Sequence, residues 1–149
     1  HDAIVRMNVG AGRQVIDLMF AMNAEQGTTL ILVTHRASLL TLVDRLIVMD
    51  KGRIMAEGSP QELIRQYSSK EVLEVRFGSQ RNAEVAEQMQ GKYGERIEVL
   101  PDRVLVYTED GEEDLRRLTA DGLHPMTSLV RRSSLEDVFL RLTGRSLVD

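Results

Sequence analysis

The sequence predicts an α/β fold arranged as two units, residues 1–69 and residues 70–149. Apolar residues at helical spacing alternate with short, branched apolar runs, which is typical of mixed helices and strands. The balance of charge also changes near residue 70. Lys and Arg number 7 against 7 Asp and Glu up to Ser69, but 12 against 16 from Lys70 onward. A change in composition of this kind indicates a boundary between units.

A helix and a buried strand are expected early in the first unit. Val15, Leu18 and Met22 recur at helical spacing, which predicts an amphipathic helix over residues 13–25. The run at 28–33 is apolar, rich in branched side chains and free of polar alternation. Such a run is typical of a strand covered on both faces, so we expect it to belong to a parallel sheet.

His35 follows this strand at its carboxyl end. Open α/β sheets bind ligands beyond the carboxyl ends of their strands, so His35 is a candidate site residue. A histidine at a strand end can instead simply bond a neighbouring carbonyl, and the residue type alone leaves both interpretations open. A short apolar helix over residues 37–43 is expected next.

A hairpin and a capped helix complete the first unit. Apolar runs at 46–49 and 53–56 predict two strands joined by a tight turn. Ser59, with Glu62 three residues later, forms a capping-box pattern that predicts the start of a helix. The polar stretch at 67–69 then marks the expected boundary.

The second unit is expected to follow the order strand, helix, strand, strand, helix, strand. This βαββαβ order is that of the ferredoxin-like fold. Ser134 and Asp137 can cap a final helix, which Gly144 ends. The six earlier elements are expected at residues 71–77, 82–90, 96–99, 103–107, 112–119 and 126–132.

Composition argues against several classes of function. Because the chain contains no cysteine, disulfides and thiolate metal sites are excluded, and we predict no metal site. Only 4% of the residues are aromatic and the net charge is −4, which does not fit a nucleic-acid-binding protein. No apolar run approaches the roughly 20 residues of a membrane span, so we expect a soluble chain.

Three stretches of the first unit belong together: Gly-Thr-Thr-Leu-Ile-Leu-Val-Thr-His-Arg at 27–36, Val-Asp-Arg-Leu-Ile-Val-Met-Asp-Lys-Gly-Arg-Ile at 43–54 and Glu-Gly-Ser-Pro-Gln-Glu-Leu at 57–63. They resemble the late part of an ABC-transporter nucleotide-binding domain. The resemblance implies that residues 1–69 are the C-terminal portion of such a P-loop-type domain. It also implies that His35 is the switch histidine of the H-loop, which contacts the γ-phosphate of ATP and helps to position the attacking water. An imidazole can both donate and accept a hydrogen bond there.

The first residues depart from the pattern of that family. An ungapped register sets Asp2 in the place of the catalytic glutamate, His1 in that of the magnesium-associated aspartate and Asn8 in that of the D-loop aspartate. Aspartate is one methylene shorter than glutamate, so we expect Asp2 to hold the water too far from the phosphorus. The alternative is that these first residues carry no site.

Two further motifs of the family do not occur in the 149 residues. No G-x-x-x-x-G-K-S/T motif is present to hold the β- and γ-phosphates, and the signature Leu-Ser-Gly-Gly-Gln is missing as well. We therefore expect that this chain does not hydrolyse ATP alone. The resemblance implies ATP and Mg²⁺ as cofactors only where the missing elements are supplied.

The end of the second unit resembles drug-efflux ATPases of the daunorubicin-resistance type, through Ser-Ser-Leu-Glu-Asp-Val-Phe-Leu-Arg-Leu-Thr-Gly-Arg at 133–145. This resemblance implies an export function, with residues 70–149 serving in assembly or control of the pump. It also implies a transmembrane permease subunit and a second ATP-binding subunit as partners, on the cytoplasmic face of the membrane. The alternative is a non-enzymatic interaction or regulatory module.

Overall fold

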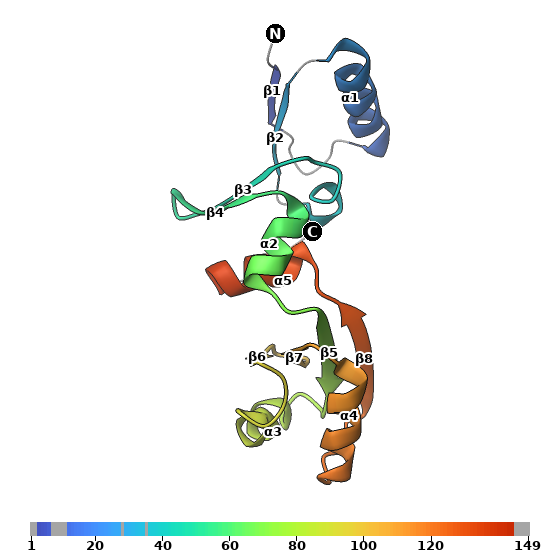
Figure 1. Ribbon diagram of the computed structural model, residues 1–149, viewed down its shortest axis with the longest axis vertical. Coiled ribbons are helices and arrows are strands. Elements are labelled where there is room, and N and C mark those ends of the chain that lie inside the picture. The colour runs from blue at the N-terminus through green and yellow to red at the C-terminus, as the bar shows by residue number, and fades with distance from the viewer. Residues whose placement is uncertain (1–2, 7–11, 28, 35, 145–149) are drawn as a thin grey trace.

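The computed structural model describes residues 3–6, 12–27, 29–34 and 36–144. These residues form an elongated molecule, with the N-terminal elements at one end and an antiparallel sheet at the other (Figure 1). The described part contains five α-helices and eight strands. The predicted α/β class is therefore confirmed.

The N-terminal elements form a strand, helix, strand unit. Strand β1 (Ala3–Arg6) pairs in parallel with β2 (Leu30–Val33), and helix α1 (Arg13–Gln26) lies between them in the chain. We predicted that the second strand is covered on both faces, but Ile31 and Val33 are 46% and 55% exposed. The difference arises because, in the described part, β1 is the only strand paired with β2. The larger parallel sheet of a P-loop-type domain is therefore not formed by these residues.

The helix predicted over 37–43 is shorter than expected. A 3-10 helix, η1, covers only Ala37–Leu39. Leu39 is buried, whereas Leu42 is 56% exposed. The exposed Leu42 adds no packing to the second half of the predicted helix, and a helix of so few residues gains too little without packing to continue.

The predicted hairpin is confirmed. Strands β3 (Leu46–Asp50) and β4 (Arg53–Gly58) pair antiparallel, with Asp50 opposite Arg53. The two residues between them, Lys51 and Gly52, have φ values of 47° and 73°. Positive φ at both central positions is the requirement of a type I′ turn, which matches the twist of the strands.

Helix α2 (Pro60–Tyr67) begins at the capping box that the sequence predicts. The Glu62 N–H donates to Ser59 Oγ at 3.2 Å, and the Ser59 N–H donates to Glu62 Oε2 at 2.9 Å. These two bonds satisfy backbone donors that the helix leaves without a partner.

The second unit has the predicted βαββαβ order. Its strands form one antiparallel sheet in the order β6-β7-β5-β8, and α3 and α4 cover one face of it. The core on that face includes Leu73, Val106 and Met89, all with no exposed surface. The elements are β5 (Glu71–Arg76), α3 (Asn82–Met89), β6 (Arg96–Val99), β7 (Val104–Thr108), α4 (Gly111–Ala120) and β8 (Thr127–Arg132).

The final helix, α5 (Leu135–Thr143), returns toward the first unit and lies beside α2 (Figure 1). Leu135 and Val138 pack with Leu63 of α2 in one apolar cluster. Leu140 of the same helix packs on the sheet face that α3 and α4 leave uncovered. The division into units at residue 69 stays a prediction, and one apolar cluster extends across it.

Gly94 offers a test of the close packing between the loop before β6 and strand β7. A Cβ at Gly94 would lie 2.5 Å from the Tyr107 carbonyl oxygen, whereas one at Gly91 would meet nothing within 4 Å. Both glycines have positive φ, so each alanine variant carries a backbone cost of about 1 kcal/mol. Gly94→Ala should lower the free energy of unfolding by about 1–3 kcal/mol more than Gly91→Ala, because its added methyl group overpacks against Tyr107. Urea unfolding measures the difference, and equal losses for Gly91→Ala and Gly94→Ala would contradict it.

Candidate functional site

The predicted switch segment begins at the carboxyl end of β2. In the parallel pair, Arg6 lies opposite Val33, so the two strands end at the same edge. The chain continues through Thr34, whose Oγ1 accepts a hydrogen bond of 3.0 Å from the Arg36 N–H. A side chain that bonds the backbone two residues on is typical of a local turn. Thr34 therefore follows β2 at the edge where α/β sheets bind ligands.

The segment after residue 35 is held by packing on α1. Leu39 of η1 and Ile16 of α1 are each 4% exposed and belong to one apolar cluster. Met19, Phe20 and Leu32 pack against this pair. The turn after β2 is therefore fixed to the helix that precedes the strand.

His35 and Asp2, the two predicted catalytic residues, lie outside the described residues. His1 and Asn8 lie outside them as well. The roles of all four stay predictions. Among the residues that the structure does describe, no three His, Asp or Glu side chains gather closely enough to hold a metal ion.

A cluster of charged side chains joins the antiparallel sheet to α5. The Arg131 guanidinium on β8 donates two hydrogen bonds of 2.8 Å to the Asp137 carboxylate on α5. Its Nε donates to Glu74 of β5 at 2.6 Å, and Arg103 donates to the same carboxylate at 3.0 Å. We call Glu74, Arg103, Arg131 and Asp137 the sheet ion cluster.

Asp137 is the most deeply buried member of the sheet ion cluster, with a side chain only 2% exposed. Besides Arg131, its carboxylate accepts hydrogen bonds from the Ser134 N–H at 2.8 Å and from the Tyr107 hydroxyl at 3.2 Å. A buried carboxylate is tolerated only when its charge is paired and its oxygens have donors. The contacts of Asp137 meet both conditions.

The charges of Asp137 and Arg131 stay fixed around neutral pH. Burial alone would raise the pKa of Asp137, but the hydrogen bonds and charge of Arg131 and the Ser134 N–H together lower it below the ordinary aspartate value. The bond to Asp137 raises the pKa of Arg131. Burial, followed by the neighbouring Asp137 charge, raises the pKa of the Tyr107 phenol. An ion pair with a neutral phenol beside it is a structural arrangement rather than an acid–base pair.

Comparison with known proteins gives matches in both units. Residues 83–144 match the family model "Nodulation factor export protein NodI, C-terminal domain". Nod factor export ATP-binding protein I of Rhizobium sp. (strain N33) is 40% identical over 123 residues, which cover 82% of this chain and 39% of that protein. Proteins of the same name from Rhizobium etli and Burkholderia thailandensis are 38% and 36% identical, over 82% and 83% of this chain and 37% and 40% of their own lengths.

A match of 123 residues is longer than the second unit and so includes part of both. The chain corresponds to the C-terminal part of an ABC-transporter ATP-binding subunit. The resemblance that the sequence suggested is thereby confirmed. The chain spans about two fifths of the length of the curated relatives it matches. Within its described part, no helix is both long enough and apolar enough to cross a membrane.

The sequence alone does not predict most contacts of the sheet ion cluster. Asp137 was predicted only as a partner of Ser134 in a helix cap, and Arg131 was not predicted to contact it. One signal is available: Glu74 lies between Leu73 and Val75 in the middle of β5, where a carboxylate needs a partner. The partner could not be identified, because the register that brings Arg131 beside it is a property of the folded sheet.

Replacing Asp137 tests how much its ion pair with Arg131 contributes to the stability of the folded chain. Asp137→Asn removes the buried charge that pairs with Arg131, which keeps only Glu74 as its ion-pair partner, and should cost about 2 kcal/mol at pH 7. Asp102→Asn is the matched control, because Asp102 also pairs with arginines but its side chain is 56% exposed. It should cost less than about 1 kcal/mol.

The pH dependence follows from the lowered pKa of Asp137. Its contribution is present above the pKa of an unfolded aspartate and is lost as the pH falls through the folded pKa. The stability difference between wild type and Asp137→Asn should therefore shrink below about pH 4. Urea unfolding at several pH values measures this, and a constant difference down to the acid limit would contradict it.

Proposed function

We propose that this chain contributes the switch histidine, His35, to the ATP site of an ABC exporter. The observation that carries the proposal is the parallel β1–β2 pair, from whose carboxyl edge the chain leads into Thr34 and His35. The similarity to Nod factor export ATP-binding proteins supports the same conclusion. In this proposal residues 1–69 belong to a P-loop-type domain, and residues 70–149 form a ferredoxin-like unit that follows it.

Exposed apolar side chains in the first unit support a larger domain. Val15, Leu18 and Met22 of α1 are between 47% and 60% exposed, and Ile31 and Val33 of β2 are similarly open. Apolar surface of this extent indicates contact with further protein. A larger parallel sheet would cover the open faces of β2, as the sequence of that strand predicts.

In the proposed site, His35 would contact the γ-phosphate of Mg-ATP. Its imidazole could donate to a phosphate oxygen and help orient the attacking water. Asp2 would take the place of the glutamate that positions this water, and its shorter side chain predicts slow hydrolysis. The Walker A, Walker B and signature elements would come from polypeptide that these 149 residues do not include.

The proposal extends to partners and location. A subunit of this kind would pair with a second ATP-binding subunit and dock on a transmembrane permease at the cytoplasmic face of the membrane. The transported molecule is named only for the relatives, which are Nod factor export proteins.

A second candidate function is an interaction or regulatory module in residues 70–149. The observation that favours it is the family model, which matches residues 83–144 as a separate C-terminal domain. The core between the sheet and helices α3 and α4 also lies wholly within these residues. The two proposals are compatible, because a regulatory unit can follow a nucleotide-binding one.

Substitution of His35 tests the first proposal in a longer polypeptide that supplies the missing motifs. His35→Ala should lower the rate of ATP hydrolysis at least about 100-fold, because the γ-phosphate contact is lost. His124→Ala is the control, since His124 is exposed in a loop. Equal rates for the two variants would contradict the proposal.

Calorimetry on the 149-residue chain with Mg-ATP should show weak or no binding, because the phosphate-binding loop is missing. Micromolar binding with turnover would show that the missing elements are not needed.

The second proposal predicts that residues 70–149 fold when expressed alone. Amides of β5 and β7 should stay protected from hydrogen exchange, because their core is complete. Amides of α5 should exchange faster than in the whole chain, because Leu135 and Val138 lose Leu63. An unfolded fragment would show that the two units depend on a shared core.

A further inference from the structure

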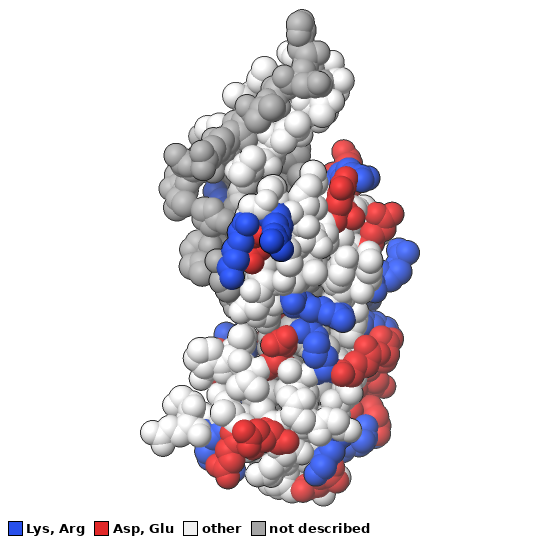
Figure 2. All heavy atoms as spheres, turned by 90° about the vertical axis from the view of Figure 1, so that its left-hand side faces the viewer, with Lys and Arg blue, Asp and Glu red and all other residues white. Residues whose placement is uncertain are grey.

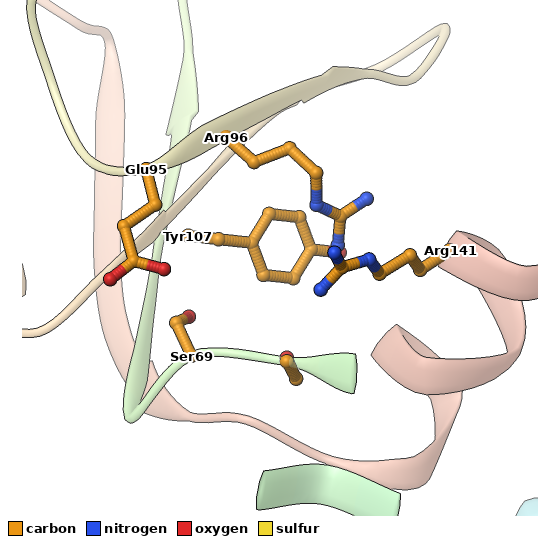
Figure 3. A pocket seen from close by; sticks show the side chains of 6 residues that line it. Ser69, Glu95, Arg96, Tyr107 and Arg141 are labelled. Carbon is orange, nitrogen blue, oxygen red and sulfur yellow. The ribbon is translucent and has the colours of Figure 1, made fainter. Parts of the chain in front are cut away.

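A pocket of about 250 Å³ lies where the polypeptide between α2 and β5 passes the sheet and the last helix. Its lining comes from parts of the chain far apart in sequence: the linker, the start of β6, strand β7 and helix α5. We call it the linker pocket. The residues that line it are Ser68, Ser69, Glu95, Arg96, Tyr107 and Arg141 (Figure 3).

Arg96 lines the linker pocket and carries a donor without a partner. Its guanidinium lies 3.9 Å above the centre of the Tyr107 ring, and its Nη1 is paired with Glu98. Its Nη2 is buried and has no hydrogen-bond partner among the described residues. A buried donor of this kind is costly unless a ligand or water bonds to it.

Arg141 brings a second positive charge. Its Nη1 donates to the Tyr67 carbonyl oxygen at 2.8 Å, which leaves its charge uncompensated. Within the described residues, no carboxylate lies at ion-pair distance from Arg141. Figure 3 shows both guanidinium groups directed toward the hydroxyl end of the Tyr107 ring. The Tyr107 hydroxyl donates a hydrogen bond to Asp137, which fixes the position of the Tyr107 ring in the pocket lining.

The rest of the lining limits what can bind. The Ser68 hydroxyl donates to Ser133 Oγ at 3.0 Å, and the Ser69 hydroxyl donates to the Glu71 carbonyl at 2.7 Å. Figure 3 shows the Glu95 carboxylate on the side of the pocket away from the two arginines. The arginine side therefore carries the charge of Arg141, which no described carboxylate pairs, beside Arg96, whose charge Glu98 compensates. The opposite side carries the negative charge of Glu95.

We propose that the linker pocket binds a small oxyanion, a phosphate or carboxylate group, between Arg96 and Arg141. Planar guanidinium groups match the geometry of such groups and would give charge-assisted hydrogen bonds. The bound anion would satisfy Arg96 Nη2 and compensate the charge of Arg141. It would also join α5 to β6 beside the linker that connects the two units. The proposed lining does not include His35, so failure of this proposal leaves the ATP proposal unaffected.

Nuclear magnetic resonance titration of the whole 149-residue chain tests this site without nucleotide. Inorganic phosphate and acetate are added in separate arms at constant ionic strength, because salt alone screens surface charge. The expected result is a saturable shift of the Ser68, Ser69 and Arg96 amides with millimolar affinity. Saturation by phosphate alone identifies a phosphate site, and saturation by acetate alone identifies a carboxylate site.

Variants assign the binding to the two arginines. Arg141→Gln and Arg96→Gln should each weaken binding at least tenfold, and Glu95→Gln should strengthen it, because a repelling charge is removed. Arg116→Gln is the matched control, since Arg116 is 74% exposed on α4 and lies outside the pocket. It should bind as wild type does.

Two results would overturn the proposal. One is the absence of a saturable shift with either anion, and the other is wild-type affinity in Arg141→Gln. Arg141 is exposed at its bond to Tyr67, so its variant should fold even if Arg96→Gln, which loses the stacking on Tyr107, does not. Loss of binding in Arg141→Gln with retention in Arg116→Gln would support the site on its own.

Discussion

The bidentate pair between Arg131 and Asp137 is the contact on which the arrangement of the second unit and its last helix depends. It lies between an edge strand of the sheet and the first turn of α5, and Asp137 is almost completely buried there. A buried carboxylate without its arginine would be unstable, so the helix can start only where Arg131 reaches it. The same carboxylate accepts from the Ser134 N–H, which joins the helix cap to the sheet.

The position of α5 in turn determines how the two units meet. Its Leu140 packs on the sheet, while Leu135 and Val138 pack with Leu63 of α2. The helix therefore contributes to both sides of the predicted boundary. Charged side chains of both signs cover the middle and lower parts of the face seen in Figure 2. On this molecule apolar packing joins the units, and ion pairs set the orientation of the joining helix.

The two units differ in how completely they bury their apolar residues. The core under α3 and α4 is closed, with Leu73, Val75 and Val106 fully buried. In the first unit, by contrast, β2 and α1 leave large apolar side chains exposed. A chain spanning about two fifths of its curated relatives is consistent with this contrast, since the parallel pair has open faces that further protein could cover. In the second unit the buried Asp137 carboxylate has its charge paired by Arg131 and its oxygens bonded to donors.

The sequence by itself determined the local elements and the family. The Ser59–Glu62 capping box, the turn at Lys51 and Gly52 and the βαββαβ order all follow from short-range rules, and the structure confirms them. The motif around His35 identified an ABC-transporter ATP-binding subunit, although His35 itself lies outside the described residues. Short-range patterns suffice for these features because caps and turns depend on neighbours only a few residues apart.

Only the tertiary structure decided which distant residues meet. The Arg131–Asp137 pair, the return of α5 to α2 and the linker pocket all join segments whose contact depends on strand register and helix packing. The same holds for the exposure of Ile31 and Val33, which an apolar run alone predicted to be buried. Burial depends on which strands and helices are present to cover a surface, and a local sequence pattern carries no information about that cover.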